Sequence, residues 1–377
     1  MRNNIDKKLS IVFLDFDDIK NPLLGAGQAK GTLEVGKRLV EKGHRVTVLC
    51  SRYPGYRNRI ENGIKYQHIG LGTSNIKLNN MAYIFVTPFF VKRLKNVDII
   101  VECFTAPITT LFSPLFTKTP VVAIPTSFEA ERFSRLYHLP FCKIQNFGLK
   151  LYKYYISFSD FYEKKMKIIN PHIFSTVIPE GVGDEFFLIK KLKPKHVLYL
   201  GRFDLGQKGI DLLLKAYSKI ANKAKYPLII AGKGPDENKI VKLIKELKLE
   251  EKVSMIGPTY GKKKNKYLSE AIFVAFPSRD ETFSCFALEA LAAGLPLVSF
   301  NIPGIEWTGE IVAKKAKPYD IDEYSKLLLS TMNEKHAQKL GKIARKFASH
   351  FTWNSVVDKY ENFFFSVLRK EKINYAK

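Results

Sequence analysis

The chain lacks the features that mark several large classes of protein. It has only 4 cysteines in 377 residues, Cys50, Cys103, Cys142 and Cys285. They stand far apart without a Cys-x-x-Cys pair, which argues against a disulfide framework or a zinc site. The most hydrophobic stretch, 104–124, is broken by three prolines and a lysine, so no apolar run is long enough to cross a bilayer. The polar first residues show no signal peptide. We therefore expect a cytoplasmic protein with reduced thiols, placed at most on the inner face of a membrane.

Acidic residues are also scarce, with 36 Asp and Glu against 61 Lys and Arg, a formal charge of +25. The surplus is spread over both halves of the chain and forms no tail, so we expect no nucleic-acid partner. A diffuse basic surface suits an anionic membrane face or phosphorylated substrates. A genome-wide preference for Lys, Ile, Asn, Tyr and Phe would explain the charge equally well.

The order of predicted elements indicates an α/β protein. A strand over 9–16 is followed by a loop with Gly25-Ala26-Gly27, a helix over 29–42 and a strand over 46–50. Strand, glycine-containing loop, helix and strand open a doubly wound parallel sheet. Further strands are expected at 99–102, 121–124 and 175–178.

The same cycle restarts in the second half. We expect strands at 196–201, 227–231, 253–256, 271–276 and 297–300, and helices at 209–220, 238–247 and 284–294. The run 179–195 interrupts the pattern with Pro, Gly and Lys. We therefore predict a first domain over 1–180, a second over 181–350, and a helix within 351–377 that packs back on the first. Two such sheets, facing each other, would share a ligand cleft.

Two carboxylates follow the strand 271–276. Glu281 lies in the loop after it, and Glu289 lies inside an otherwise apolar helix that starts near Ser284. The helix N-terminus favours an anion above the carboxyl edge of the sheet. A buried carboxylate needs a hydrogen-bonding partner, which for Glu289 is either a ligand or a Lys or Arg of the core.

Two cations follow the strand 196–201. Arg202 offers a planar fork and Lys208 a compact charge, a combination suited to a diphosphate. Solvated surface charge is the simpler explanation for such residues, and the carboxylate pair in the same half of the chain weakens it.

Together these motifs resemble the retaining, sugar-nucleotide-dependent glycosyltransferases of family 4, group 1 glycosyl transferases with the GT-B fold of two Rossmann-like domains. The resemblance covers nearly the whole chain. It rests on the elements Ile178-Pro179-Glu180-Gly181-Val182, Gly201-Arg202, Lys208-Gly209, Gly232-Lys233-Gly234-Pro235 and the pair Glu281 and Glu289. Glu180 stands where the family usually has Asn.

The resemblance implies a role for each motif. Arg202 and Lys208 would hold the donor diphosphate and stabilise the charge that develops on it. Glu281 would lie against the donor sugar and Glu289 would accept hydrogen bonds from the ribose. The remaining donor-site residues implied are Gly25, Gly27, Gly232, Lys233, Thr282, Phe283 and Ser284. The resemblance also implies that this chain needs no cofactor and uses a UDP- or GDP-linked sugar as donor and a lipid-linked molecule or glycan as acceptor.

On the acceptor side the sequence departs from the family. Many members have a His after a strand of the first domain, but 124–129 contains none. We expect Ser127 or Glu129 to serve there, while His138 is more consistent with a structural role.

A second interpretation concerns Asp15-Phe16-Asp17-Asp18. Asp-x-Asp binds a metal–nucleotide complex in GT-A transferases, and carboxylates suit Mg²⁺ or Mn²⁺. Here the motif ends the first strand, which favours loop and cap hydrogen bonds, and we expect no metal.

Three function classes remain open. The first is a hexosyl transfer at the membrane surface, with the apolar and basic segments 79–95 and 147–167 docking on anionic lipid. The second is a non-catalytic nucleotide- or nucleic-acid-binding protein that keeps the fold. The third, a Rossmann oxidoreductase, is disfavoured because Gly25-Ala26-Gly27 lacks the full glycine fingerprint.

Overall fold

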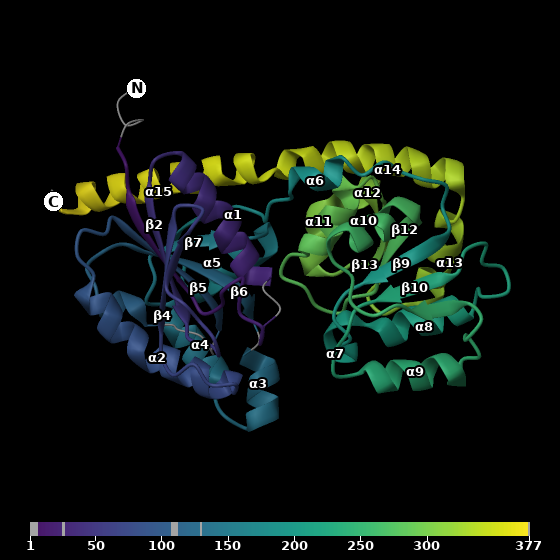
Figure 1. Ribbon diagram of the computed structural model, residues 1–377, viewed down its shortest axis with the longest axis horizontal. Helices are drawn as coiled ribbons and strands as arrows, with labels where there is room; N and C mark the ends of the chain where they lie inside the picture. The colour runs from purple at the N-terminus through teal and green to yellow at the C-terminus, as the bar shows by residue number, and fades with distance from the viewer. Residues whose placement is uncertain (1–6, 25–26, 107–111, 129, 376–377) are drawn as a thin grey trace. The chain divides into compact units, whose positions relative to one another are not determined.

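The computed structural model describes residues 7–24, 27–106, 112–128 and 130–375 (Figure 1). The chain divides into two compact units. The first unit combines Met1–Glu180 with Trp353–Lys377, and the second unit is Gly181–Thr352. Among the described residues, no helix has both the length and the apolar character needed to cross a membrane.

The first unit is built on an eight-stranded sheet in the order β3-β4-β2-β1-β5-β6-β7-β8. β3 runs antiparallel to β4, and the other neighbours pair in parallel. The strands are β1 (Ser10–Asp15), β2 (Arg45–Ser51), β3 (Arg59–Glu61), β4 (Ile64–Ile69), β5 (Ile99–Ala106), β6 (Val121–Phe128), β7 (Tyr154–Ser157) and β8 (Phe174–Val177).

Helices flank this sheet. They are α1 (Gly27–Glu41), α2 (Ile76–Arg93), α3 (Ala130–Tyr137), α4 (Phe141–Leu149), α5 (Asp160–Ile169) and α15 (Trp353–Tyr375), with a short 3₁₀ turn at Ser113–Leu115. α15, the last helix of the chain, lies beside α1 (Figure 1). Arg38 Nε donates to Asn354 Oδ1 at 2.7 Å, and Lys42 pairs with Glu361 at 2.8 Å. Helix α15 therefore belongs to the first unit and packs on α1.

The second unit has a six-stranded parallel sheet in the order β11-β10-β9-β12-β13-β14. Numbered along the unit this is 3-2-1-4-5-6, the Rossmann order. The strands are β9 (His196–Leu200), β10 (Leu228–Ala231), β11 (Val253–Met255), β12 (Ala271–Phe276), β13 (Leu297–Phe300) and β14 (Ala313–Ala316). All six residues of β12 are buried, as expected of a central strand covered on both faces.

Helices cover both faces of this sheet, with α8 and α9 on one and α10 and α11 on the other (Figure 1). The helices are α6 (Asp184–Phe187), α7 (Leu205–Lys208), α8 (Ile210–Ser218), α9 (Glu237–Glu246), α10 (Gly261–Glu270), α11 (Cys285–Ala292), α12 (Gly309–Val312), α13 (Ile321–Thr331) and α14 (Glu334–Ala348), with 3₁₀ turns at Pro303–Thr308 and Ser349–Phe351. Each unit is thus a doubly wound sheet, and the predicted fold class is confirmed.

The helix expected over 209–220 is present as α8, and a short helix, α7, precedes it. Gly209 lies between α7 and α8 with φ +63°, and a Cβ there would lie 2.1 Å from the carbonyl oxygen of Pro277. Only glycine accommodates both the left-handed backbone and this close approach. The break holds Lys208 at the end of α7, directly beside the loop that follows β12.

The hairpin β3–β4 was absent from the predicted elements. Asn62 and Gly63 form its two-residue turn, with φ of +51° and +73°. Asn-Gly is the preferred sequence for this type of turn. The signal was therefore present in the sequence, but the short, charged strand 59–61 did not stand out.

The two segments expected to face a membrane differ in the structure. In α2, Tyr83 and Val91 face the core, whereas Phe85 and Phe89 are 68% and 67% exposed. In the segment 147–167, by contrast, Tyr152 and most other aromatic side chains are buried. The prediction for the second segment is wrong for these residues, because their rings are buried inside the first unit as core side chains are. An exposed apolar stripe remains on α2, formed by Leu78, Met81, Phe85, Val86 and Phe89.

Candidate active site

Three loops meet at the carboxyl edge of the second unit's sheet, around its central strands. They follow β9, β10 and β12, and the strand order reverses between β9 and β12. Open α/β sheets bind their ligands at this kind of switch point. Most of the predicted residues of the second half lie in the segments that follow these strands, and Glu289 lies within α11.

Lys208 and Glu281 lie in contact. The ammonium of Lys208 donates to Glu281 Oε1, and Ser278 Oγ donates to the same oxygen at 2.9 Å. Glu281 is only 7% exposed, so these donors, more than bulk water, supply the hydrogen bonds that its buried carboxyl group needs. The predicted cation after β9 and the predicted carboxylate after β12 therefore form one polar centre.

A second set of bonds fixes the two loops to each other. Arg279 N donates to Gln207 O at 2.8 Å, and the Arg279 guanidinium forms a two-pronged pair with Asp211 at 2.7 and 2.8 Å. Hydrogen bonding to Asp211 raises the pKa of Arg279. Sequence reasoning missed Arg279, whose position beside Asp280 and Glu281 gave no sign of a partner on α8.

Arg202 has different partners from Lys208. Its guanidinium donates to Asp204 Oδ2 at 3.0 Å and to Gln207 Oε1 at 2.8 Å, and its side chain is 56% exposed. The two cations predicted to act on one diphosphate are thus held by different carboxylates. The side chain of Arg202 is more exposed than that of Lys208.

Gly232 and Lys233 bring the loop after β10 against the loop after β9. Lys233 O accepts from Phe203 N at 2.9 Å. Gly232 has φ +149°, and a Cβ on it would lie 1.9 Å from Gly201 O. The packing of two backbones therefore requires glycine at position 232. The contact of Gly232 with the donor stays a prediction.

Glu289, on α11, is paired with Lys264 of α10. The ammonium of Lys264 donates to Glu289 Oε2 and lies 4.9 Å from the ring centre of Phe186 and 5.7 Å from that of Phe286. This contact realises the second alternative left open by the sequence, a lysine partner for Glu289. Nothing in the sequence distinguished Lys264 from its neighbours Lys262, Lys263 and Lys266.

The segment 282–284 leads into α11. Ser284 caps the helix, with its side chain accepting from Ala287 N at 3.2 Å. Phe283 stacks on Trp307, with ring centres 4.5 Å apart, and Thr282 between Glu281 and Phe283 is partly exposed. The cap and the ring stack fix the N-terminus of α11 at the carboxyl edge of the sheet, beside Glu281.

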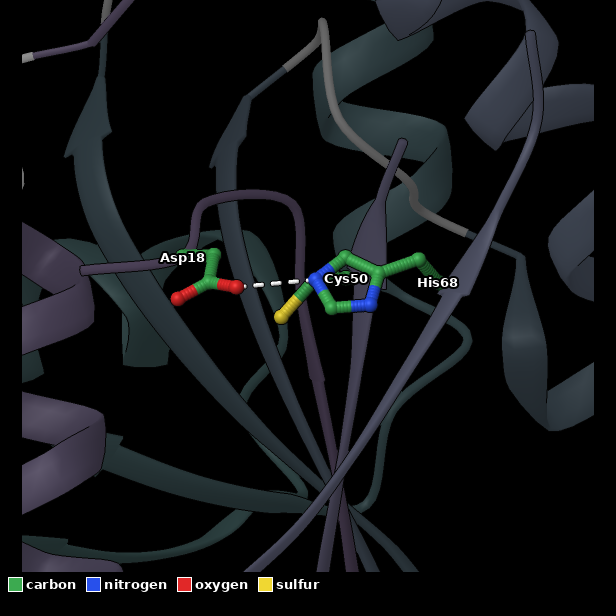
Figure 2. Close-up of side chains that lie close together, drawn as sticks. All are labelled: Asp18, Cys50 and His68. Atoms are coloured by element: carbon green, nitrogen blue, oxygen red, sulfur yellow. Dashed lines mark hydrogen bonds and ion pairs between the residues drawn. The ribbon is translucent and has the colours of Figure 1, made fainter. Parts of the chain in front are cut away.

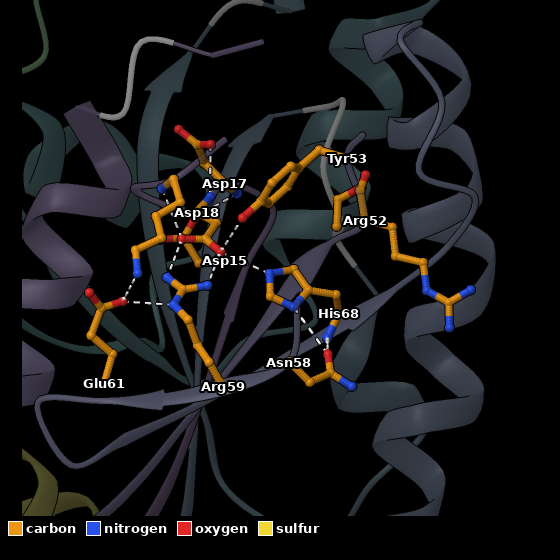
Figure 3. Close-up of polar contacts among 11 residues, drawn as sticks. Asp15, Asp17, Asp18, Arg52, Tyr53, Asn58, Arg59, Glu61 and His68 are labelled. Atoms are coloured by element: carbon orange, nitrogen blue, oxygen red, sulfur yellow. Dashed lines mark hydrogen bonds and ion pairs between the residues drawn. The ribbon is translucent and has the colours of Figure 1, made fainter. Parts of the chain in front are cut away.

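The first unit has a separate polar network centred on Asp18 (Figure 3). The carboxylate accepts two hydrogen bonds from Arg59, at 2.6 and 2.7 Å, one from Tyr53 at 3.1 Å and one from His68 at 2.8 Å. Burial alone would raise the pKa of Asp18, but the bonds from Arg59 and His68 outweigh it and hold that pKa well below its usual range. Asp18 thus fastens the loop after β1 to β3 and β4.

The neighbouring acids make local hydrogen bonds in the same loop. Asp17 Oδ1 accepts from Asp18 N at 2.8 Å, and Asp15 Oδ1 accepts from Asp17 N at 3.2 Å. Asp15 also accepts from Thr32 Oγ1. Burial raises the pKa of Asp15 to about 6, against the effect of the Thr32 bond. Such contacts are typical of acidic residues that begin a loop. Loop and cap hydrogen bonds are the role that the sequence favoured for the Asp-x-Asp motif.

Asp18, Cys50 and His68 could together offer three ligand atoms to a metal ion, since these atoms lie within 4.8 Å of one another (Figure 2). The chemistry of the donors does not fit. Both oxygens of Asp18 already accept from Arg59. Burial, and then Asp15 and Asp18, raise the pKa of the Cys50 thiol well above its ordinary value, whereas a metal needs the thiolate. The cluster is explained as a structural network.

The remaining predicted residues are in the first unit. Gly27 begins α1 and is exposed. Ser127 belongs to β6, near its carboxyl end. Gly25 and Glu129 lie outside the described residues.

The segment that contains this site is similar to known proteins. Residues 184–347 match the family model of glycosyl transferases group 1. An N-acetylgalactosamine-N,N'-diacetylbacillosaminyl-diphospho-undecaprenol 4-alpha-N-acetylgalactosaminyltransferase of Campylobacter jejuni is 35% identical over 126 residues, 33% of each chain. The match thus spans about a third of this curated relative.

Two solved structures share the fold over nearly the whole chain. A sucrose-phosphate synthase from Thermosynechococcus elongatus has a TM-score of 0.79 at 16% identity, covering 96% of this chain and 100% of that one. Anabaena HepE, solved in complex with UDP and glucose, has a TM-score of 0.71 at 14% identity, covering 95% and 100%. The chain therefore has the two Rossmann-like domains of the GT-B fold, and its residues 184–347 match the group 1 glycosyl transferases.

Proposed function

We propose that the chain is a retaining glycosyltransferase. It moves a hexose-type sugar from a UDP- or GDP-linked donor to a lipid-linked, glycolipid or polysaccharide acceptor, without a metal ion. The observation that carries this proposal is the contact between Lys208 and Glu281 at the switch point of the second sheet. It lies within the segment that matches the glycosyl transferase model.

The two cations of the site suit a nucleoside diphosphate as leaving group. Lys208 is fixed beside Glu281, and Arg202 presents a half-exposed guanidinium nearby on the same loop. When the glycosidic bond breaks, negative charge grows on the diphosphate, and cations already in place stabilise it without reorganising. Glu281 then faces the donor sugar, and the hydrogen bond from Lys208 orients its carboxylate.

α11 serves the rest of the donor. Its N-terminus, capped by Ser284, carries partial positive charge that favours phosphate oxygens. Glu289 accepts hydrogen bonds from the ribose, in addition to the one from Lys264. The structure of HepE with UDP and glucose supports a nucleotide of this kind for the shared fold.

The acceptor side is in the first unit. The relative from Campylobacter jejuni is named for a diphospho-undecaprenol acceptor, which lies in a membrane. The apolar stripe of α2, ending at Lys92 and Arg93, supports a similar membrane-bound acceptor here. We place the reaction at the inner face of the membrane. The acceptor hydroxyl attacks on the face from which the diphosphate leaves, and a donor phosphate oxygen takes its proton.

A screen of UDP-, GDP- and ADP-sugars with lipid-linked and soluble glycan acceptors tests the proposal. Turnover should persist in EDTA, and NMR of the product should show the donor's anomeric configuration. Inverted product would overturn the retaining step alone. Nucleotide binding without turnover of any sugar would favour the non-catalytic alternative.

A further inference from the structure

A cavity of about 650 Å³ opens in the second unit at the amino-terminal edge of its sheet. It is bounded by the segment 191–194, by Ala271 and Ile272 at the start of β12, by Gly294, and by one face of α14. This size is within the range of small-molecule sites. The polar centre of Lys208 and Glu281 lies at the opposite edge of the same sheet.

The cavity brings together cations that backbone carbonyls hold in place. Lys191 Nζ donates to Leu268 O at 2.5 Å and to Ala271 O at 2.8 Å. The Arg345 guanidinium donates to Ile189 O at 2.7 Å and to Ala293 O at 3.0 Å. Lys193 and Lys342 add two further positive charges to the lining.

The cavity is short of compensating acid. The lining residues include one carboxylate, Glu334, among the part of the chain that the structure describes. That carboxylate accepts from Lys225 and from Tyr226. Loss of hydration and then the nearby charge of Arg345 lower the pKa of Lys191 to about 7. Neighbouring cations with so little acid around them favour a bound anion.

The rest of the lining is apolar. Leu192, Pro194, Ile272 and Ala337 contribute hydrocarbon surface between the cations. A ligand that matches both the cations and the apolar walls needs an anionic group and a short apolar group. A dianion suits the several cations better than a singly charged group does. Inorganic phosphate alone would leave the apolar walls uncovered.

We propose that this cavity is an effector site for a phosphate monoester that carries a short apolar group. Its connection to the candidate active site is helix α11. Arg345 binds Ala293 O at the end of this helix, and Gly341 is so close to Gly294 that a Cβ on it would lie 2.2 Å from Gly294 O. Ser284 caps the other end of α11, and Glu289 lies within it. A ligand on Arg345 therefore alters the position of α11 and with it nucleotide affinity. The last step rests on the proposed function, but binding does not.

Calorimetric titration of the full chain tests binding, with octyl phosphate below its micelle concentration, inorganic phosphate and octyl glucoside as probes. Octyl phosphate should bind at least about tenfold more tightly than inorganic phosphate, and octyl glucoside should not bind. The double variant Lys193→Glu/Lys342→Glu should lose this binding by about tenfold or more. The control Lys335→Glu/Lys339→Glu changes the net charge by the same amount, at two residues of α14 that do not line the cavity. This control should bind octyl phosphate as the wild type does.

Equal loss in both double variants, or no binding of octyl phosphate, would overturn the site. UDP affinity measured with and without octyl phosphate tests the coupling, and an unchanged affinity would overturn the effector role. If UDP does not bind at all, the proposed function fails. The titration with octyl phosphate still shows whether the cavity binds this anion. Vesicles with phosphatidic acid should compete with octyl phosphate if the natural ligand is a lipid, and should not if it is a soluble ester.

Discussion

Lys208 donates a hydrogen bond to Glu281, 73 residues further along the chain. The contact joins the loops after β9 and β12, on either side of the point where the strand order reverses. Under the proposed function, the cation would face the diphosphate of the donor and the carboxylate would face its sugar.

Removing the two cations should impair the chemical step more than binding. We expect Arg202→Ala/Lys208→Ala to lower turnover by a factor on the order of 10²–10³, because charge on the leaving diphosphate is largest in the transition state. Steady-state kinetics with the sugar nucleotide found in the screen measures this. Lys215→Ala/Lys223→Ala, which removes two exposed lysines of the same unit, should be fully active. Undiminished turnover in the first variant would refute the assignment.

Glu289→Gln separates the ribose role from simple pairing with Lys264. An amide accepts hydrogen bonds less strongly than a carboxylate, so nucleotide affinity should fall by roughly 1–3 kcal/mol. The loss should be smaller for the 2′-deoxynucleotide, which offers one hydroxyl fewer. If Glu289→Gln lowers the melting temperature but leaves nucleotide affinity intact, the carboxylate serves only to pair with Lys264.

Asp18→Asn should destabilise the first unit strongly. Arg59 would lose the partner of two hydrogen bonds inside the fold, and breaking a buried ion pair costs about 3–5 kcal/mol. Urea unfolding followed by circular dichroism measures the change. Glu61→Gln is the matched control, since Glu61 also pairs with Arg59 but at a more exposed position, and it should cost about 1 kcal/mol or less. Similar losses in both variants would contradict the central role of Asp18.

Glu180 should make stability depend on pH. Burial raises its pKa to about 7, although Lys30 opposes the shift, whereas an unfolded Glu releases its proton near pH 4.3. Between about pH 4 and 7 the folded state therefore binds more protons, and stability falls as pH rises through this window. Glu180→Gln removes the free-energy cost of ionising a buried carboxyl group. The melting temperature of this variant should therefore exceed that of the wild type at pH 8 and match it near pH 4. Glu185→Gln, at an exposed position, should show no such pH-dependent difference in melting temperature from the wild type.

The apolar stripe of α2 should bind anionic vesicles. Phe85→Glu/Phe89→Glu should reduce co-sedimentation with phosphatidylglycerol vesicles severalfold, because charges replace rings that insert among the headgroups. Ile168→Glu/Leu188→Glu alters two apolar residues elsewhere that are even more exposed, and this variant should bind normally. Binding should also fall with salt and require anionic lipid. Sedimentation that is the same with neutral vesicles would exclude electrostatic docking.

Much of the fold was predictable because its signals are local. β12 and α11 follow from an apolar run, a Ser cap at 284 and a glycine at 294, all visible within 24 residues. The hairpin β3–β4 was missed although its turn is local, because its strands are short and carry charged residues. The tyrosines of 152–162 could not be assigned from sequence, since an aromatic residue beside lysines suits a core and a membrane surface equally.

The candidate site was predictable in its parts and not in its pairing. Lys208 and Glu281 were both singled out, but only the folded sheet brings them into contact. The partners of Arg279 and Glu289 lie 68 and 25 residues away in the sequence, and one sequence holds no signal for them. Residues at strand ends can be predicted, whereas which of them meet is decided by tertiary packing.

The first unit is interrupted in sequence by the second, since its last helix α15 begins at Trp353. During synthesis the second unit is complete before the ribosome has made the helix that covers α1. Until then, the surface that receives Phe363, Phe364 and Val367, all buried in the finished protein, has no cover. A fragment ending at residue 180 would be left permanently in that state and should aggregate, whereas a circular permutant joining α15 to the start of β1 would keep the first unit continuous. The order of translation thus makes α15 the element whose synthesis completes the first unit.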